Sequence, residues 1–188
     1  MSRFRGKIAI LKGGYSDERE ISLKTGENVE KALEELGFNF VSIDCRDDFI
    51  TQLSKSNFDL CFNALHGEFG EDGQIQALLE KIGIRYTHSG VSASILAMNK
   101  VFSKEIFLKN KIPTPDYKIK DTNKINPSDI PIPSVVKPIN NGSSVGVYII
   151  LSESDKTNFL NELSNWHYGK YLMIEKYIKG RELTCGII

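Results

Sequence analysis

The sequence predicts an α/β fold: a doubly wound parallel sheet in the N-terminal part, followed by a smaller α+β part with an antiparallel sheet. Strand-like and helix-like segments alternate within about the first 65 residues, as in parallel sheets joined by right-handed crossovers. After the proline-rich stretch "IPTPDY", the strand-like segments follow one another closely around a single helix, which is typical of antiparallel neighbours. We therefore expect two domains, residues 1–98 and residues 99–188.

The first strand, "KIAIL", ends at Gly13 and Gly14, and a helix follows over "SDEREISLKTGENVEKALEELG". Ser16 or Asp17 can cap the start of this helix, and Gly37 can end it. Four apolar residues recur at helical spacing and should form its buried face: Ile21, Val29, Leu33 and Leu36. We expect the helix to pack on the sheet through this face.

The same signals predict the remaining helices and strands. In the first part these are strands over "FNFVSIDC" and "FDLCFNAL", with helices over "DFITQLSK" and, beginning near Glu71, over "EDGQIQALLEKIG". The stretch "VSASILAMNKVFSKEIFLKNKI" predicts one helix with Lys100 in its middle. In the second part we expect strands over "DYKIK", "PSVVKPI", "VYIIL", "KYLMIEKYI" and "RELTCGII", and one helix over "SDKTNFLNELSNW".

Composition excludes several classes of protein. Lysine plus arginine and aspartate plus glutamate both total 24, so no net charge indicates nucleic acid or an anionic membrane as partner. No apolar run approaches the roughly 18 residues that span a bilayer, and the run in "MSRFRGKIAIL" is too short for a signal peptide. We expect a cytoplasmic protein. Its three cysteines, Cys45, Cys61 and Cys185, lie far apart on strand-like segments and should be reduced and buried.

Two polar residues follow strands of the predicted parallel sheet. Glu18 comes after the first strand, and His66 comes directly after the third. Because the carboxyl ends of such strands meet at one edge, an acid and an imidazole can approach each other there in one crevice. Each residue also has a plainer interpretation. A lone histidine at a strand end is more often a polar cap on the sheet, and Glu18 supplies negative charge at a helix N-terminus.

The stretch "NNGSSVGV" lies between two predicted strands and is poor in large side chains. It fits a hairpin turn, because Gly, Asn and Ser tolerate the backbone conformations that reverse a chain. It also fits a loop whose converging backbone amides cradle a phosphate. Lys137 lies just upstream, at the end of the preceding strand. Both interpretations stay open on these residues alone.

Five stretches resemble, in order and spacing, the successive signatures of the D-alanine–D-alanine ligases, which belong to the ATP-grasp superfamily. They are "GGYSDEREIS", "NALHGEFGEDGQIQALLE", "YTHSGVSASILAMNK", "VVKPINNGSSVGV" and "IEKYIKGRELT", and the resemblance spans residues 7–188. It implies ATP-dependent joining of two D-alanines, through a D-alanyl phosphate, to the dipeptide used in peptidoglycan precursors. Members of the family are usually dimers, so the resemblance also implies a homodimer.

The resemblance implies roles for three residues at the substrate site. Glu18 matches the glutamate that holds the ammonium of the first D-alanine, a suitable task for a carboxylate in a crevice. His66 resembles the histidine close to the substrate carboxylates. Ser143 matches a loop serine that hydrogen-bonds near Glu18 and the substrate. We expect these side chains to act on the amino acid.

The resemblance also implies a site for the ATP phosphates. Lys100 and Lys137 match two lysines that contact them, and a compact ammonium on a flexible stem suits that work. Without the resemblance, Lys100 would be read as a solvated helix residue. The glycine-rich loop would close over the triphosphate through four residues: Gly142, Ser143, Ser144 and Gly146.

The adenosine part of ATP would lie along "MIEKYIKGRE". The resemblance implies that Glu175 approaches the adenine base and that the backbone of Lys176 and Ile178 pairs with this base. It also implies that Glu182 binds the ribose hydroxyls. The plainer interpretation is an edge strand with alternating apolar residues.

Family members continue well beyond the residue that matches Ile188, and the resemblance places their Mg²⁺ ligands in that later part. We expect no metal ligand within residues 1–188, and no dipeptide synthesis by these residues alone. Two other functions stay open: a non-catalytic nucleotide-binding protein, and an ATP-grasp carboxylate ligase that uses another amino acid or hydroxy acid.

Overall fold

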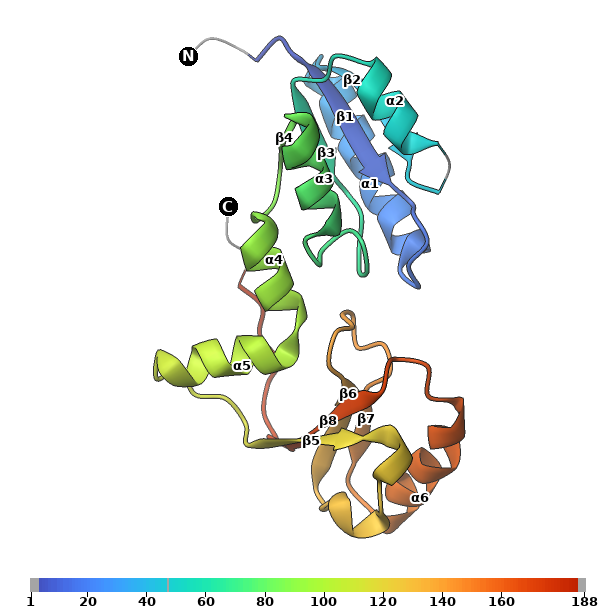
Figure 1. The fold of residues 1–188 in the computed structure, drawn as a ribbon, viewed down its shortest axis with the longest axis vertical. Helices are drawn as coiled ribbons and strands as arrows, with labels where there is room; N and C mark the ends of the chain where they lie inside the picture. Colours follow the sequence, from blue (N-terminus) through green and yellow to red (C-terminus); the bar gives the residue numbers. More distant parts are fainter. Residues whose placement is uncertain (1–3, 47, 186–188) are drawn as a thin grey trace. The chain divides into compact units, whose positions relative to one another are not determined.

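The chain divides into two compact units, with the division between Asn99 and Lys100 (Figure 1). The computed structural model describes residues 4–46 and 48–185. Unit 1 ends at Asn99, unit 2 begins at Lys100, and each is described by itself. Within the described residues, no helix combines the length and the apolar character that crossing a bilayer requires.

Unit 1 is built on a four-stranded parallel sheet with the strand order β2-β1-β3-β4. The strands are β1 (Lys7–Lys12), β2 (Asn39–Asp44), β3 (Leu60–Asn63) and β4 (Arg85–Tyr86). The helices are α1 (Arg19–Glu35), α2 (Phe49–Lys55), α3 (Gln74–Ile82) and α4 (Val91–Met98). The parallel pairing and the alternation with helices confirm the predicted doubly wound sheet.

Helices cover both faces of this sheet, because successive residues of a strand point to opposite sides. Ala9 and Leu11 of β1 share one core with buried residues of α2 and α3, whereas Ile8 and Ile10 belong to a second core. Two of the apolar residues predicted for α1 pack against this second core: Val29 and Leu33. Figure 1 accordingly shows α1 on the opposite side of the sheet from α2 and α3.

The rest of the predicted buried face of α1 is wrong. Ile21 and Leu36 are 50% and 56% exposed, whereas Ser22 and Gly26 are buried. A Cβ atom at Gly26 would lie 2.5 Å from Cδ of Lys12, so the helix approaches β1 too closely for a larger side chain. The contact of α1 with the sheet therefore combines two small residues, Ser22 and Gly26, with Val29 and Leu33.

The predicted cap of α1 is also wrong. The N-cap residue is Glu18, and its side chain makes no capping hydrogen bond. The hydroxyl of Ser16 instead donates to the carbonyl oxygen of His66, 2.7 Å away across the loop. The helix does end as predicted at Gly37, where φ is 65° and the N–H donates to the carbonyl oxygen of Glu34.

Unit 2 contains a four-stranded antiparallel sheet with the order β5-β8-β6-β7, which confirms the predicted α+β part. Its strands are β5 (Tyr117–Asp121), β6 (Ser134–Pro138), β7 (Tyr148–Ile150) and β8 (Tyr171–Lys176). Its helices are α5 (Lys100–Lys109) and α6 (Glu153–Glu162), with 3₁₀ turns at Thr122–Lys124, Pro127–Asp129 and Leu163–Asn165.

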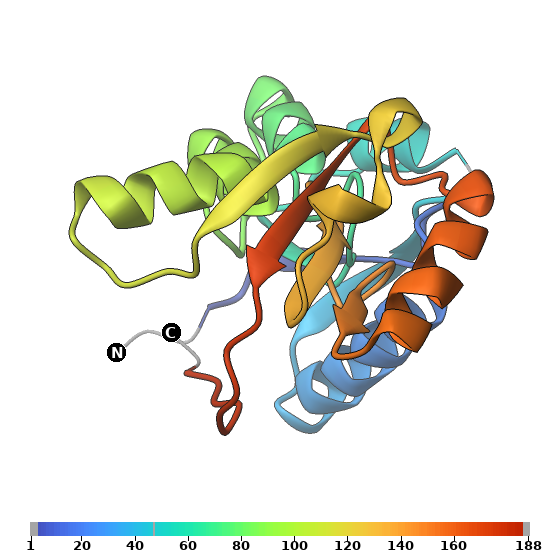
Figure 2. The same cartoon turned by 90° about the horizontal axis from the view of Figure 1, so that it is seen from below.

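One face of the unit 2 sheet packs against α6, which runs beside the strands in Figure 2. Leu172 and Ile174 of β8 form the core there with Val136 and with Phe159 of α6. By the alternation along a strand, Glu175 faces the other side of the sheet. β8 lies between β5 and β6, so the interpretation of this segment as an edge strand is wrong.

Two predicted helices have other bounds. The single helix expected across Lys100 is divided, because Asn99 is extended with φ −84° and ψ 109°, and α5 starts at Lys100. The helix expected near Glu71 starts at Gln74. Before it, the carboxylate of Asp72 accepts hydrogen bonds from the backbone N–H groups of Phe69 and Gln74, which holds a turn in place of a first helical turn.

The end of the described chain also departs from the prediction. Residues 181–185 form no strand, and residues 186–188 lie outside the described residues. Cys185 is exposed, contrary to expectation, whereas Cys45 and Cys61 are buried, and all three are free thiols. Burial raises the pKa of the Cys45 thiol to about 12.

Candidate functional site

Serine hydroxyls join the loops that follow β1 and β3. The Ser22 hydroxyl accepts a hydrogen bond from the N–H of Gly13 and donates one to the carbonyl oxygen of Ala64, both at 2.8 Å. The Ser16 hydroxyl donates to the carbonyl oxygen of His66. These neutral bonds hold the two loops together at the carboxyl edge of the sheet, the edge where ligands bind in open parallel sheets.

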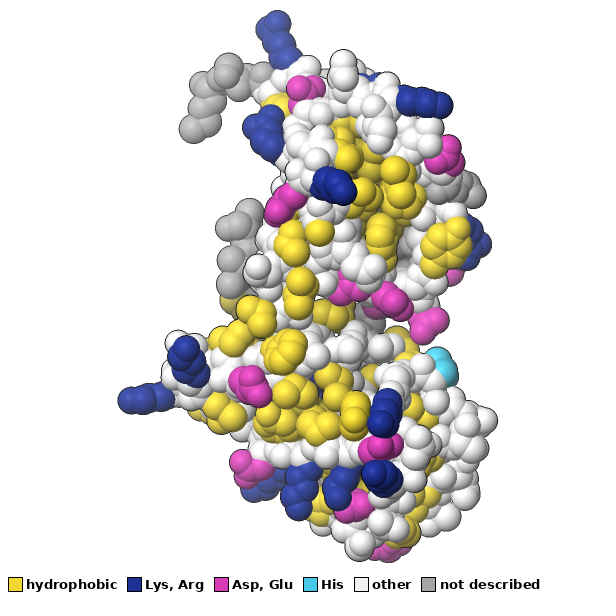
Figure 3. Space-filling model, in the orientation of Figure 1, with side chains coloured by type: hydrophobic (Ala, Val, Ile, Leu, Met, Phe, Trp, Pro, Cys, Tyr) yellow, Lys and Arg dark blue, Asp and Glu magenta, His cyan; other side chains and the backbone are white. Residues whose placement is uncertain are grey.

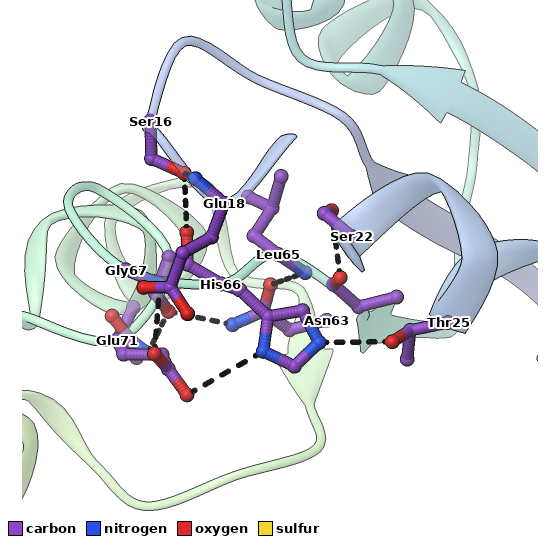
Figure 4. A network of polar contacts seen from close by, with 12 residues as sticks. Ser16, Glu18, Ser22, Thr25, Asn63, Leu65, His66, Gly67 and Glu71 are labelled. Carbon is purple, nitrogen blue, oxygen red and sulfur yellow. Dashed lines mark hydrogen bonds and ion pairs between the residues drawn. The ribbon is translucent and has the colours of Figure 1, made fainter. Parts of the chain in front are cut away.

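Glu18 lies at the start of α1, with only 7% of the residue exposed. A Cβ atom at Gly67 would lie 2.6 Å from Oε2 of Glu18, so the glycine is what allows the carboxylate to approach this loop. Gly67 also has φ 69°, a left-handed conformation that favours glycine. Figure 4 shows the Glu18 carboxylate directed at the Gly67 backbone.

The imidazole of His66 lies between a hydroxyl and a carboxylate (Figure 4). Its Nε2 is 2.9 Å from Oγ1 of Thr25, and its Nδ1 is 3.9 Å from Oε1 of Glu71. The other oxygen of Glu71 accepts a hydrogen bond from the N–H of Gly67, at 2.7 Å. The acid within ion-pair distance of the imidazole is therefore Glu71, whereas the prediction paired His66 with Glu18.

A cavity of about 660 Å³ opens beside these groups within unit 1. Ser16, His66 and Glu68 line its polar side, and apolar residues such as Phe49 and Leu78 line the remainder. Its size is in the range of pockets that bind small molecules. The unit thus offers a binding cavity in which the polar groups are concentrated at the carboxyl edge of the sheet.

In unit 2, one buried carboxylate lies between two lysines. Glu175 of β8 is 6% exposed, and its Oε1 is 2.7 Å from Nζ of Lys104 on α5. Its Oε2 forms an ion pair with Nζ of Lys137 on β6. Lys104 is 4% exposed, whereas the Lys137 side chain is more accessible. Lys137 and Glu175 were predicted as ligand contacts, whereas in the structure they also form an ion pair with each other.

Lys100 ties the start of α5 to the glycine-rich loop. Its backbone N–H donates to the carbonyl oxygen of Ile139 at 3.0 Å, and its Nζ donates to the carbonyl oxygen of Asn141. Burial lowers the pKa of the Lys100 ammonium, and the positive charge of Lys137 lowers this pKa further. The two ammonium groups therefore lie within range of each other's charge.

The loop over residues 139–147 is a hairpin connection, because β6 and β7 pair on either side of it. Ser143 and Ser144 both have positive φ, 47° and 60°, a conformation that costs about 1–3 kcal/mol per residue and is concentrated at functional sites. A Cβ atom at Gly146 would lie 2.7 Å from the Tyr168 ring and 2.8 Å from Pro138. Gly146 is thus required by packing, and the loop can serve both as a hairpin and as an anion-binding turn.

The residues predicted to contact adenosine lie along and after β8. The N–H of Lys176 donates to the carbonyl oxygen of Asp116 at 3.0 Å, so this donor is already used within the sheet. Ile178 is 60% exposed, and Glu182 is exposed as well. The predicted role of Ser143, a hydrogen bond near Glu18 and the substrate, involves residues of different units and stays a prediction.

Three residues of these sites were missed in the sequence. Thr25 lies seven residues after Glu18, and Lys104 lies four residues after Lys100, so helical spacing places each near a predicted site residue. Glu71 lies in the turn that returns towards His66. Helical spacing could have suggested Thr25 and Lys104, and the closeness of Glu71 to His66 in sequence could have suggested Glu71. Spacing alone predicts neither the burial of Lys104 nor its partner.

Within the described residues, there is no group of three or more His, Cys, Asp or Glu side chains arranged to hold a metal ion. At the carboxyl edge of unit 1, the carboxylate of Glu71 is engaged with His66 and with the backbone N–H of Gly67. Glu175 is engaged with lysines, which exclude a cation there. The described residues therefore do not fit a magnesium site.

Two protein families match the chain, one in each part. Residues 46–89 match the family described as D-ala D-ala ligase N-terminus, and residues 106–188 match D-ala D-ala ligase C-terminus. A D-alanine–D-alanine ligase of Wolbachia pipientis is 48% identical over 183 residues, which are 96% of this chain and 58% of that protein. The chain thus spans somewhat more than half the length of this curated relative.

Solved structures with the same fold lead to the same family. A D-alanine–D-alanine ligase from Bacillus anthracis superposes with a TM-score of 0.78 at 32% identity, over 93% of this chain and 58% of that one. The Bacillus anthracis enzyme complexed with ATP superposes with a TM-score of 0.77 at 31% identity, over 93% of this chain and 60% of that one. With both family models matched in order and the fold shared throughout, the chain belongs to the D-alanine–D-alanine ligase family.

Proposed function

We propose that this chain supplies the ATP site and the first-substrate site of an enzyme that joins two D-alanines. The observation that carries the proposal is a group of three lysines: Lys104 and Lys137 are bonded to Glu175, and Lys100 is bonded to the glycine-rich loop. Three ammonium groups and one carboxylate leave an excess of two positive charges, which suits a polyanion. The ATP complex of the Bacillus anthracis relative supports the choice of nucleotide.

The phosphates of ATP would lie between the loop and the ammonium groups of Lys100 and Lys137. The left-handed Ser143 and Ser144 form a tight turn, closed by the N–H of Val145 donating to the carbonyl oxygen of Gly142, and the other backbone amides of the loop would face the phosphates. Gly142 and Gly146 keep large side chains out of this loop. In this proposal the lysines neutralise phosphate charge, and the backbone holds the phosphates in position.

The base would lie at the end of β8. Because the N–H of Lys176 is already bonded to Asp116, Lys176 would offer the base its carbonyl oxygen, and Ile178 would offer an N–H. Glu182 would accept hydrogen bonds from the ribose hydroxyls. Glu175 would contact the base from within the sheet, next to its two lysine partners.

The first D-alanine would bind at the carboxyl edge of the unit 1 sheet. The buried carboxylate of Glu18 would hold the substrate ammonium, and His66, oriented by Thr25 and Glu71, would lie near the substrate carboxylate. The product would be D-alanyl-D-alanine for peptidoglycan precursors, formed through a D-alanyl phosphate in the cytoplasm by a homodimer. ATP would bring Mg²⁺ as its counter-ion, held by groups other than the described residues.

ATP binding tests the first part of this proposal. We expect isothermal titration calorimetry on the 188-residue chain to detect ATP and ADP binding that weakens as salt is raised, because charged contacts are screened. The matched control is adenosine, whose binding should be weaker and insensitive to salt. Equal affinity of the chain for ATP and adenosine would contradict the proposed phosphate site.

Dipeptide formation tests the second part. A chimera would carry residues 1–188 of this chain followed by the continuation of the Wolbachia pipientis relative, and mass spectrometry would detect D-alanyl-D-alanine formed from ATP and D-alanine. Parallel reactions with D-lactate or D-serine as the second substrate would identify a ligase of another specificity. A folded chimera that binds ATP and forms no product with any of these substrates would favour a non-catalytic nucleotide-binding protein.

A further inference from the structure

Helix α5 buries a lysine and exposes its apolar residues. Lys104 is 4% exposed, whereas four large apolar residues of the same helix are 39–57% exposed: Phe102, Ile106, Phe107 and Leu108. Figure 3 shows apolar side chains gathered on the surface of this helix. A lysine is almost never buried unless it is paired. The orientation of Lys104 towards the sheet is therefore set by its polar partners.

All three donors of the Lys104 ammonium have a partner inside unit 2. Its Nζ is 2.7 Å from Oε1 of Glu175, 2.8 Å from Oγ1 of Thr114 and 2.7 Å from the carbonyl oxygen of Pro115. The ammonium also lies 5.0 Å from the centre of the Tyr117 ring, within range of a cation–π contact. With its hydrogen-bonding capacity used in this way, Lys104 cannot itself bind a phosphate.

Glu175 transmits the position of Lys104 to Lys137. One carboxylate oxygen is held by Lys104 and the other by Lys137, so the three side chains form a continuous chain from α5 through β8 to β6. Lys104 also shares the negative charge of Glu175. If Lys104 were neutral, the whole charge of this buried carboxylate would act on Lys137 and on any anion beside it.

We propose that Lys104 is a positioning residue of the nucleotide site, which orients Lys137 through Glu175 and keeps Glu175 from repelling the phosphates. The inference rests on the proposed binding of ATP phosphates by Lys137. When Lys104 is removed, Glu175 keeps Lys137 as its partner, so the buried carboxylate is not left without a compensating charge. The effect of Lys104 should therefore appear in phosphate recognition more than in the folding of unit 2.

The first test compares the affinities for ATP and adenosine in the 188-residue chain. We expect Lys104→Met to weaken ATP binding about tenfold, the size of a charge-assisted contact, and adenosine binding less than about twofold. The matched control is Lys109→Met, an exposed lysine of the same helix, which should change neither affinity. An unchanged ratio of the two affinities in Lys104→Met would overturn the proposal, even if the thermal midpoint fell.

The double variant Lys104→Met, Glu175→Gln separates charge from packing. Because it also removes the carboxylate, the repulsion of the phosphates is gone, but Lys137 still lacks its partner, so the ATP affinity relative to adenosine should recover part of the loss seen in Lys104→Met and stay below the wild-type value. A merely structural role would instead give two losses that add, which would contradict the proposal. The double variant also leaves no uncompensated buried charge, so it keeps the test available if Lys104→Met alone does not fold.

A measurement without nucleotide distinguishes failure of this inference from failure of the proposed function. Nitrogen-15 NMR of the lysine ammonium groups in the free chain should show a Lys137 signal whose protons are protected from exchange with water. This signal should be lost in Glu175→Gln and broadened in Lys104→Met. An unchanged Lys137 signal in Lys104→Met would overturn the positioning role. The Lys137 signal could broaden in Lys104→Met while the wild-type chain binds ATP and adenosine with equal affinity. That result would support the positioning of Lys137 and contradict only the proposed phosphate site.

Discussion

In unit 1 the buried carboxylate of Glu18 approaches a glycine backbone, and the loops around it are joined by serine hydroxyls. In unit 2 the buried carboxylate of Glu175 lies between two ammonium groups. In the proposed function the first arrangement would hold a small cation, the ammonium of D-alanine. The second would hold two ammonium groups in place for the phosphates of ATP. The same residue type would thus serve opposite electrostatic purposes in the two units.

This contrast predicts different sensitivities for the two sites. Geometry set by hydrogen bonds to serine and backbone groups changes little with salt, whereas attraction between a lysine group and a polyanion is screened. Where a glycine makes room for the carboxylate, an added methyl group should weaken binding of the ligand. Where ion pairs set the geometry, removal of one charge should weaken it. The following substitutions test each of these expectations.

The largest effect is expected for Lys137→Met in unit 2. The change removes the more accessible of the two ammonium groups bound to Glu175 and leaves the carboxylate facing the phosphates. ATP affinity should fall by about a hundredfold, the upper range of a charge-assisted hydrogen bond, and its salt dependence should diminish. Calorimetry on the chain measures both. Retention of ATP affinity within twofold would show that Lys137 does not face the phosphates.

Glu18→Gln in unit 1 should give the next largest effect. The amide keeps the shape of the side chain and removes the charge that would hold the ammonium of the first D-alanine. In the chimera, the KM for this substrate should rise about tenfold or more, because a hydrogen bond to a charged group is worth roughly 1.5–3 kcal/mol. The affinity for ATP should stay the same. A KM for D-alanine that does not change would exclude Glu18 as the ammonium partner.

A smaller effect is expected for Gly67→Ala, which adds one methyl group 2.6 Å from Oε2 of Glu18. The carboxylate must move, so the KM for D-alanine should rise severalfold, and unfolding should become easier by about 1 kcal/mol because φ is positive. Gly83→Ala is the matched control, since Gly83 has φ 76° and nothing within 4 Å of the added methyl group. It should share the loss of stability without the change in KM. Equal KM values in both variants would contradict the role of Gly67 in admitting Glu18.

The comparison of the two units also shows what could be predicted from the sequence. The parallel sheet, its loops and the positions of Glu18 and His66 followed from periodicity and from glycines at strand ends, which are local signals. The buried lysine of α5 could not be predicted, because its burial depends on Glu175, 71 positions away in sequence. The small inner face of α1 was missed for a similar reason, since it is set by the approach of the helix to Lys12.

The smallest effect is expected for Thr25→Val, which removes the hydroxyl at Nε2 of His66 and keeps the shape of the side chain. A neutral hydrogen bond contributes about 0.5–1.5 kcal/mol, so the KM of the chimera for the first D-alanine should rise about threefold. Nitrogen-15 NMR of the imidazole should show a changed balance of its two neutral tautomers, because Nε2 has lost its partner while Glu71 remains near Nδ1. Thr25→Ser restores a hydroxyl and should restore both values. Thr157→Val on α6, where the hydroxyl donates to the backbone of its own helix, is the matched control and should change neither. If Thr25→Val left the imidazole spectrum as it was, the orientation of His66 would have to come from Glu71 alone.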